Sequence, residues 1–135
     1  MVIKILKSNA LYNVICFSIM IYAYKVIRYD LYSYHGIDSF CGWLAEFGVV
    51  VMVIAAVAKS RIVVGGTVIG YIVGFAIFLL CIRINPLIRY YENSYMIWSN
   101  IYILVILLSL AIAIIRGILK RKRTRVGNPR PTIKD

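Results

Sequence analysis

Four apolar stretches, separated by short charged segments, constrain the fold of this chain more than any other feature. A helix that crosses a membrane needs about 20 mostly apolar residues, because the hydrocarbon layer is about 30 Å thick and a helix rises about 1.5 Å per residue. No stretch shows the alternating period of a membrane β-strand. The sequence therefore predicts an all-α polytopic membrane protein with four transmembrane helices, at residues 8–24, 40–58, 62–82 and 95–115.

The composition excludes the main alternatives to a membrane protein. With 62% hydrophobic and 16% charged residues, a soluble domain would expose large apolar areas to water. The formal net charge of +11 raises the question of nucleic-acid binding. However, eight of the basic residues lie from Arg116 onward, directly after the last apolar stretch, as is typical of a segment that stops membrane insertion. We therefore expect no nucleic-acid partner.

The distribution of lysine and arginine predicts the orientation. If the N-terminus is cytoplasmic, the inner segments carry twelve basic residues and the outer loops carry four. The positive-inside rule then places both termini in the cytoplasm, in a multi-pass protein of the cell (plasma) membrane. We expect the first span to be retained, because no signal-peptidase site follows it.

The chain is predicted to form one transmembrane domain, residues 1–119, and a basic cytoplasmic tail, residues 120–135. The tail contains few apolar residues, so we expect it to be disordered and to lie on the anionic lipids of the inner leaflet.

The connections between spans are short. Lys59, Ser60 and Arg61 alone separate the second and third spans, which predicts an antiparallel helical hairpin. Asn85 precedes Pro86, and this pair predicts the end of the third helix. The outer loops are expected at residues 25–39 and 83–94. Aromatic residues gather at this outer side, either as an interfacial belt or as a recognition surface: Tyr22, Tyr24, Tyr29, Tyr32, Tyr34, Trp43, Tyr90, Tyr91, Tyr95 and Trp98.

Three glycines in the third span are the most specific packing signal. Gly66, Gly70 and Gly74 are spaced by four residues, so they share one helix face and form a shallow groove that another helix can approach closely. The spacing does not say whether that helix belongs to the same chain, to a second copy in a homo-oligomer, or to another membrane protein.

Glu46 is the one acidic residue inside an expected span. A charged carboxylate in the membrane is costly, so we expect it to be neutral, hydrogen-bonded within the bundle, or in contact with water. Asn100 lies at a similar depth in the antiparallel fourth span and is the expected hydrogen-bond partner. Glu46 and Asn100 are thus a candidate intramembrane polar site, with either a structural role or a role in proton or cation coupling.

The sequence contains no pattern typical of a metal site or a catalytic site. His35 is the only histidine, and no cysteine pair has metal-ligand spacing, so we expect no metal site. Cys16, Cys41 and Cys81 are expected to be buried free thiols, with a Cys41–Cys81 disulfide as the alternative. No arrangement typical of a nucleophile, a metal-dependent hydrolase or a phosphate-binding loop occurs. We therefore expect no cofactor and no enzymatic activity.

The segments Gly70–Gly74 and Asn93–Trp98 resemble small uncharacterised multi-pass membrane proteins of bacterial type, over the C-terminal half of the chain. That resemblance implies no assigned activity. The chain also differs from small multidrug transporters, which have four spans and one membrane glutamate, because their glutamate lies in the first span.

These observations predict a small integral membrane protein with an accessory or interaction role and no catalysis. The alternative is an oligomeric small transporter or channel subunit, with Glu46 as the coupling or ion-pathway residue. A holin-like pore-forming protein shares the small size and the basic tail, but fits a four-span chain with a cytoplasmic N-terminus less well.

Overall fold

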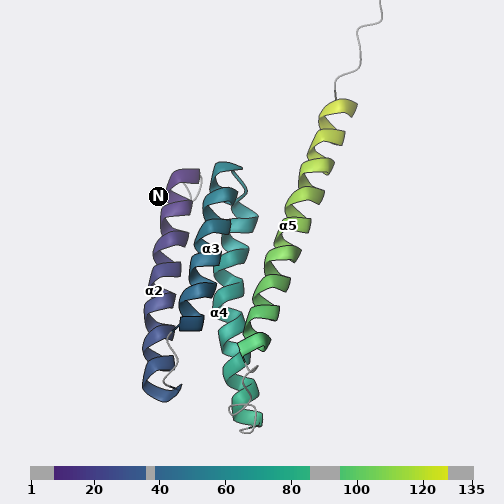
Figure 1. The fold of residues 1–135 in the computed structure, drawn as a ribbon. Helices are drawn as coiled ribbons and strands as arrows, with labels where there is room; N and C mark the ends of the chain where they lie inside the picture. Colours follow the sequence, from purple (N-terminus) through teal and green to yellow (C-terminus); the bar gives the residue numbers. More distant parts are fainter. Residues whose placement is uncertain (1–7, 36–38, 86–94, 128–135) are drawn as a thin grey trace, which may run out of the picture.

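The computed structural model describes residues 8–35, 39–85 and 95–127, and these residues form four α-helices without a strand (Figure 1). The prediction of an all-α fold is confirmed. In chain order the helices are α2 (Asn9–His35), α3 (Ser39–Val57), α4 (Arg61–Ile84) and α5 (Tyr95–Val126).

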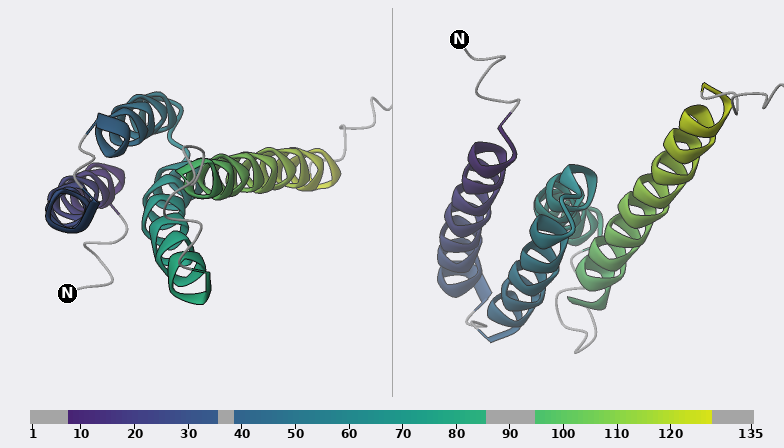
Figure 2. Two further views of the ribbon diagram at one scale, coloured as in Figure 1. Left: turned by 60° about the horizontal axis from the view of Figure 1, so that its bottom comes forward. Right: turned by 90° about the horizontal axis from the view of Figure 1, so that it is seen from above.

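Helix α4 is the centre of the arrangement, because it packs against α2, α3 and α5, while α2 also packs against α3. The start of α2, the turn between α3 and α4, and the end of α5 lie at one end of the bundle (Figure 1). Helix α5 packs on α4 near its start and then diverges from the other three helices, as the views in Figures 1 and 2 agree.

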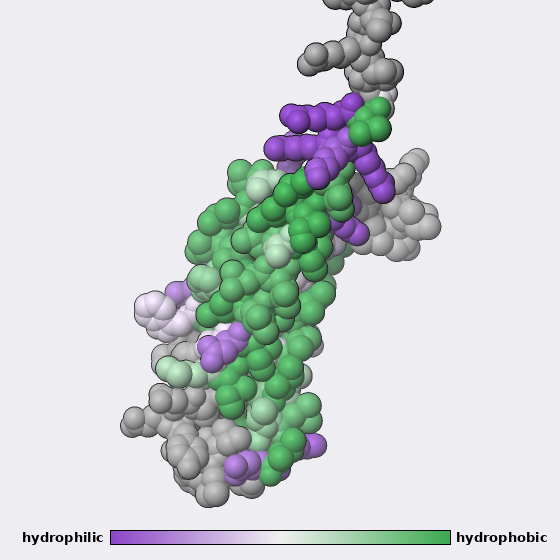
Figure 3. All heavy atoms as spheres, turned by 90° about the vertical axis from the view of Figure 1, so that its right-hand side faces the viewer, coloured by the Kyte–Doolittle hydropathy of each residue, from purple (hydrophilic) through white to green (hydrophobic). Residues whose placement is uncertain are grey.

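Three of the described helices are long and apolar enough to cross a membrane, over Asn9–Tyr29, Arg61–Ile84 and Met96–Val126. The apolar part of α3, Cys41–Val57, is shorter. Apolar side chains cover much of the outer surface, and basic side chains gather at the end of α5 (Figure 3). Exposed apolar area on this scale suits contact with lipid rather than water. The helices therefore indicate a membrane protein.

Two helices are longer than the sequence predicted. Helix α2 continues to His35 and so includes residues 25–35 of the expected outer loop. Helix α5 continues to Val126, so residues 120–126 of the tail are helical, and the prediction of disorder is wrong for them. Lysine and arginine favour helix, and a helix need not end where the membrane does. The remaining tail, residues 128–135, lies outside the described residues.

The turn between α3 and α4 is a tight helix-ending motif. The Lys59 N–H donates to the Ala56 carbonyl at 3.0 Å, and the Ser60 N–H donates to the Ala55 carbonyl at 2.8 Å. Lys59 has a φ of 56°, in the left-handed region where this motif usually has glycine. The motif reverses the chain within three residues, which makes α3 and α4 antiparallel neighbours.

Helix α4 ends where the proline signal predicted. Asn85 is extended, with φ −132° and ψ 94°, because the ring of the following proline disfavours helical backbone at the residue before it.

Candidate functional site

The glycine face of α4 lies against α5 of the same chain. A Cβ atom added to Gly66 would lie 2.5 Å from the Ser109 Cβ, and one added to Gly70 would lie 3.0 Å from the Val105 Cβ. Such distances leave no room for a side chain, so the two backbones approach each other as closely as a glycine face allows. The glycine spacing left open which helix packs on this face. In the structure it is α5, a helix of the same chain.

Trp98 closes the end of this contact that lies near Gly74. Its indole lies over Gly74, where an added Cβ would be 2.7 Å from the Trp98 Cδ1. The indole Nε1–H donates to the Tyr71 carbonyl at 3.1 Å. The Trp98 ring centroid lies 5.2 Å from that of Tyr71 and 5.3 Å from that of Phe75. The Trp98 side chain therefore joins α4 to α5 through both apolar contact and a hydrogen bond.

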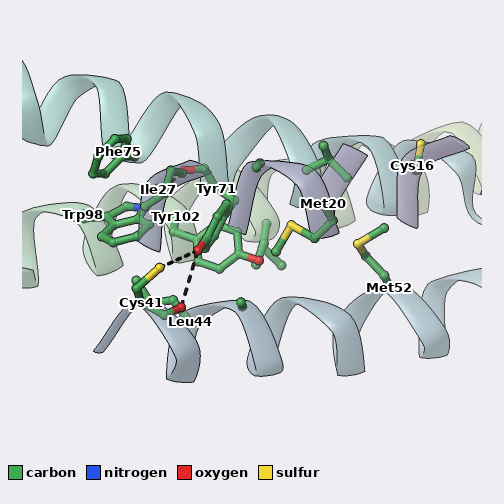
Figure 4. Close-up of a cluster of buried hydrophobic side chains, with 14 of the residues drawn as sticks. Cys16, Met20, Ile27, Cys41, Leu44, Met52, Tyr71, Phe75, Trp98 and Tyr102 are labelled. Atoms are coloured by element: carbon green, nitrogen blue, oxygen red, sulfur yellow. Dashed lines mark hydrogen bonds between the residues drawn. The ribbon is translucent and has the colours of Figure 1, made fainter. Parts of the chain in front are cut away.

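Tyr71 extends the cluster to α3 (Figure 4). Its hydroxyl lies 3.1 Å from the Cys41 sulfur and 3.4 Å from the Cys41 carbonyl, to which it donates. Cys16, Cys41 and Cys81 are free thiols. Because Tyr71 and Cys41 are both fully buried, this is a polar contact inside the apolar bundle, and it links α3 to α4.

Tyr102 occupies the middle of the same cluster. Its ring centroid lies 5.6 Å from that of Tyr71 and 6.4 Å from that of Phe47 on α3, and both contacts are edge-on. The Tyr102 hydroxyl faces Gly48, where an added Cβ would overlap it, and it is buried without a hydrogen-bond partner among the described residues. The largest fully buried side chains of the described chain, among them Trp98, Tyr71, Tyr102, Phe78 and Met20, thus fill the interior of the bundle.

The structure divides the outer aromatic residues into two groups. Tyr22, Tyr29 and Trp43 are 71%, 73% and 74% exposed, as residues of an interfacial belt would be. Trp98 is 0% exposed, so its assignment to the outer aromatic surface is wrong. Its position opposite Gly74 draws the ring into the bundle. The side chains of the other outer tyrosines, apart from Tyr24, lie outside the described residues: Tyr32, Tyr34, Tyr90, Tyr91 and Tyr95.

Glu46 lies on the outer surface of α3 and is exposed. It lines a groove of about 510 Å³ between α2 and α3, together with Tyr24, Gly42 and three apolar residues of α3. One helical turn along α2, Arg28 donates to the Tyr24 hydroxyl at 3.4 Å. The groove therefore combines a carboxyl group, a tyrosine and an apolar floor on a face that no described helix covers.

Asn100 is also exposed, on α5. Within the described part of the chain, Glu46 and Asn100 form no hydrogen bond with each other. The structure thus does not bring the candidate polar pair together. Helix α3 approaches α5 through Phe47, the next residue after Glu46, which points toward Tyr102. Because successive helix residues point about 100° apart, Glu46 faces away from that contact.

A second polar contact lies at the opposite end of the bundle. The Tyr12 hydroxyl donates to the Arg61 carbonyl at 3.1 Å, and the Arg61 side chain donates to the Asn9 side chain. The Arg61 guanidinium also lies 5.5 Å from the centre of the Tyr12 ring. These contacts attach the start of α2 to the start of α4.

Tyr71 follows Gly70 directly in the sequence, but the sequence does not predict its contacts with Cys41 and Trp98. A tyrosine in the middle of a span signals a buried hydrogen bond, because an unpaired hydroxyl is costly in hydrocarbon. The identity of the partner depends on the rotation of α3 and α5 about their axes, which the sequence does not specify.

No protein-family model matches this chain, and no curated protein or solved structure shows significant similarity to it. Among the described residues, no three His, Cys, Asp or Glu side chains are grouped to hold a metal ion. The Glu46 groove is the candidate functional site, because it is the described surface that places a carboxyl group within an apolar helix.

Proposed function

We propose that this protein is a small, non-catalytic integral membrane protein that associates laterally with another membrane protein through the Glu46 groove. It has four transmembrane helices, both termini are cytoplasmic, and it resides in the plasma membrane. The helical part of the basic tail contacts the anionic lipids of the inner leaflet.

The case for a fourth span rests on α3. This helix has 19 residues and is therefore about 28 Å long, close to the thickness of the hydrocarbon layer. It is joined to α4 by a tight turn and packs against both α2 and α4. A helix held antiparallel to two membrane-crossing neighbours crosses with them. Lys59 and Arg61 at the turn share one end of the bundle with the basic end of α5, in agreement with the positive-inside rule.

The exposed position of Glu46 carries the functional proposal. A carboxyl group about 10 Å along α3 from Ser39 is costly against lipid, and a polar or cationic group of a partner helix would offset that cost. Large aromatic side chains fill the interior of the described bundle, which favours a role on the outer surface over a pathway through one chain.

Site-specific crosslinking in native membranes tests this proposal. A photoreactive amino acid replaces Val50, which is 58% exposed and lines the Glu46 groove, or Leu108, which is 55% exposed on α5. We expect a discrete protein adduct from position 50, weakened by Glu46→Gln, and only lipid adducts from position 108. Lipid adducts alone from both positions would refute the proposal.

The exposed carboxyl also favours a second candidate, an oligomeric transporter or channel subunit in which Glu46 lies between copies. In that case the adduct from position 50 has the mass of two chains. Proton or cation flux in proteoliposomes is then lost with Glu46→Gln, while the amount of folded protein is unchanged. An adduct with a different protein, and no flux, favours the accessory role.

A further inference from the structure

A second groove opens where α5 diverges from the α3–α4 turn. It has a volume of about 460 Å³ and is almost entirely apolar. Residues near the end of α3 and the start of α4 form one wall, and residues of α5 form the other: Val51, Ile54, Ala55, Ala58, Ser60, Val63, Ile106, Leu110, Ala113 and Ile114. The divergence of α5 keeps these walls apart (Figures 1 and 2).

Cations follow the lining residues of this groove on both walls. On one wall, Lys59 lies in the turn between Ala58 and Ser60, both of which line the groove. On the other wall, helical periodicity continues the lining face of α5 from Ala113 and Ile114 to Lys120 and Arg121, seven residues on. The side chains of these three cations form no hydrogen bond or ion pair with another described residue.

Lys122 and Arg123 follow directly but belong to the opposite face of α5, because each residue rotates the helix by about 100°. The basic end of α5 thus has two pairs of the same composition. One pair continues the groove, and the other points away from it.

We propose that this groove binds one anionic phospholipid. An acyl chain lies along the apolar walls, and the phosphate lies between Lys59 and the pair Lys120 and Arg121. Apolar walls that end in cations complement a molecule with an apolar chain and an anionic head, and basic pockets between membrane helices are a recognised form of lipid site. The proposal is independent of the Glu46 groove, which lies between α2 and α3.

Native mass spectrometry tests the proposal. The full-length protein is released from nanodiscs that contain equal amounts of phosphatidylglycerol and phosphatidylcholine with the same acyl chains. We expect one retained phosphatidylglycerol per chain and little phosphatidylcholine. Removal of Lys120 and Arg121 in Lys120→Gln/Arg121→Gln should weaken phosphatidylglycerol binding by about 30-fold, because each cation near the membrane surface contributes roughly fivefold.

The matched control is Lys122→Gln/Arg123→Gln, which removes the same charges from the other face and should change binding by less than about twofold. Ala113→Phe, which fills the groove, should abolish retention. If that variant does not fold, the two charge pairs decide the question alone. Equal loss in both charge variants, equal retention of phosphatidylcholine, or a second copy of the chain in the groove would each overturn the proposal.

Discussion

At the scale of single residues, two buried tyrosines differ in one property. Tyr71 and Tyr102 are both fully buried, and their rings are in edge-on contact. The Tyr71 hydroxyl contacts Cys41, whereas the Tyr102 hydroxyl has no partner among the described residues. A buried hydroxyl stabilises the fold only when it is hydrogen-bonded, so the same chemical change has opposite effects at the two positions.

Tyr71→Phe should lower the free energy of unfolding by about 0.6 to 1 kcal/mol, because it removes the contacts with Cys41. Tyr102→Phe should leave stability unchanged or raise it by about 1 kcal/mol, because it removes a buried unpaired hydroxyl. Unfolding in mixed micelles with increasing SDS, followed by helical circular dichroism, measures both values. Equal destabilisation by the two substitutions would contradict this reading of the cluster.

At the scale of helices, the contact between α4 and α5 is set by which residues lack a side chain. Gly66, Gly70 and Gly74 admit α5, and Ser109 and Trp98 occupy the space at the two ends of the contact. Gly117 on α5 is a contrast, because an added Cβ there meets nothing within 4 Å. Glycine is therefore required at positions 66, 70 and 74, whereas Gly117 can be replaced.

Gly66→Ala should destabilise the protein by about 1 to 3 kcal/mol, because its Cβ would overlap the Ser109 Cβ. Adding Ser109→Gly removes the atom it meets and leaves the Ser109 Cα 4.0 Å away, so the double variant should recover part of the loss. Gly117→Ala is the control and should be neutral or stabilising by up to about 1 kcal/mol. The same SDS titration applies. No recovery in the double variant would mean that α5 does not occupy the glycine face.

At the scale of the whole molecule, the helices alternate in direction, so the start of α2 and the end of α5 lie at the same end of the bundle (Figure 1). The bundle is open on one side, because α5 diverges from the other helices and leaves a groove beside the α3–α4 turn. The number of membrane crossings then depends on whether α3, with its shorter apolar segment, crosses with its neighbours.

Labelling of single cysteines with a membrane-impermeant maleimide in sealed vesicles tests the topology. In a background without Cys16, Cys41 and Cys81, Ser8→Cys and Val126→Cys should react from the same side, and Ile84→Cys from the other. If α3 does not cross, the first two positions react from opposite sides, and the four-span arrangement is wrong. Ile84→Cys and Val126→Cys differ in either case, so they serve as the internal control.

The sequence alone determined the helical fold, the tight turn at Lys59 and the end of α4 before Pro86. These depend on local composition and on backbone geometry, which act over a few residues. Helix ends were less predictable. The helix continues through residues 25–35 and 120–126, which hydropathy assigns to a loop and a tail because they carry more polar and charged residues than the spans. Lysine and arginine favour helix in the second of these segments.

Only the tertiary structure decided which side chains meet. The glycine spacing in α4 predicted a close helix contact, but the identity of α5 as its partner depends on how the helices pack. The same holds for Trp98, which packs over Gly74 instead of facing the membrane–water interface. It also holds for Glu46, which faces outward instead of toward Asn100. In each case the deciding quantity is the rotation of one helix relative to its neighbours. The physical reason is that many side chains packing together set this rotation, whereas hydropathy along the chain sets only where each helix runs.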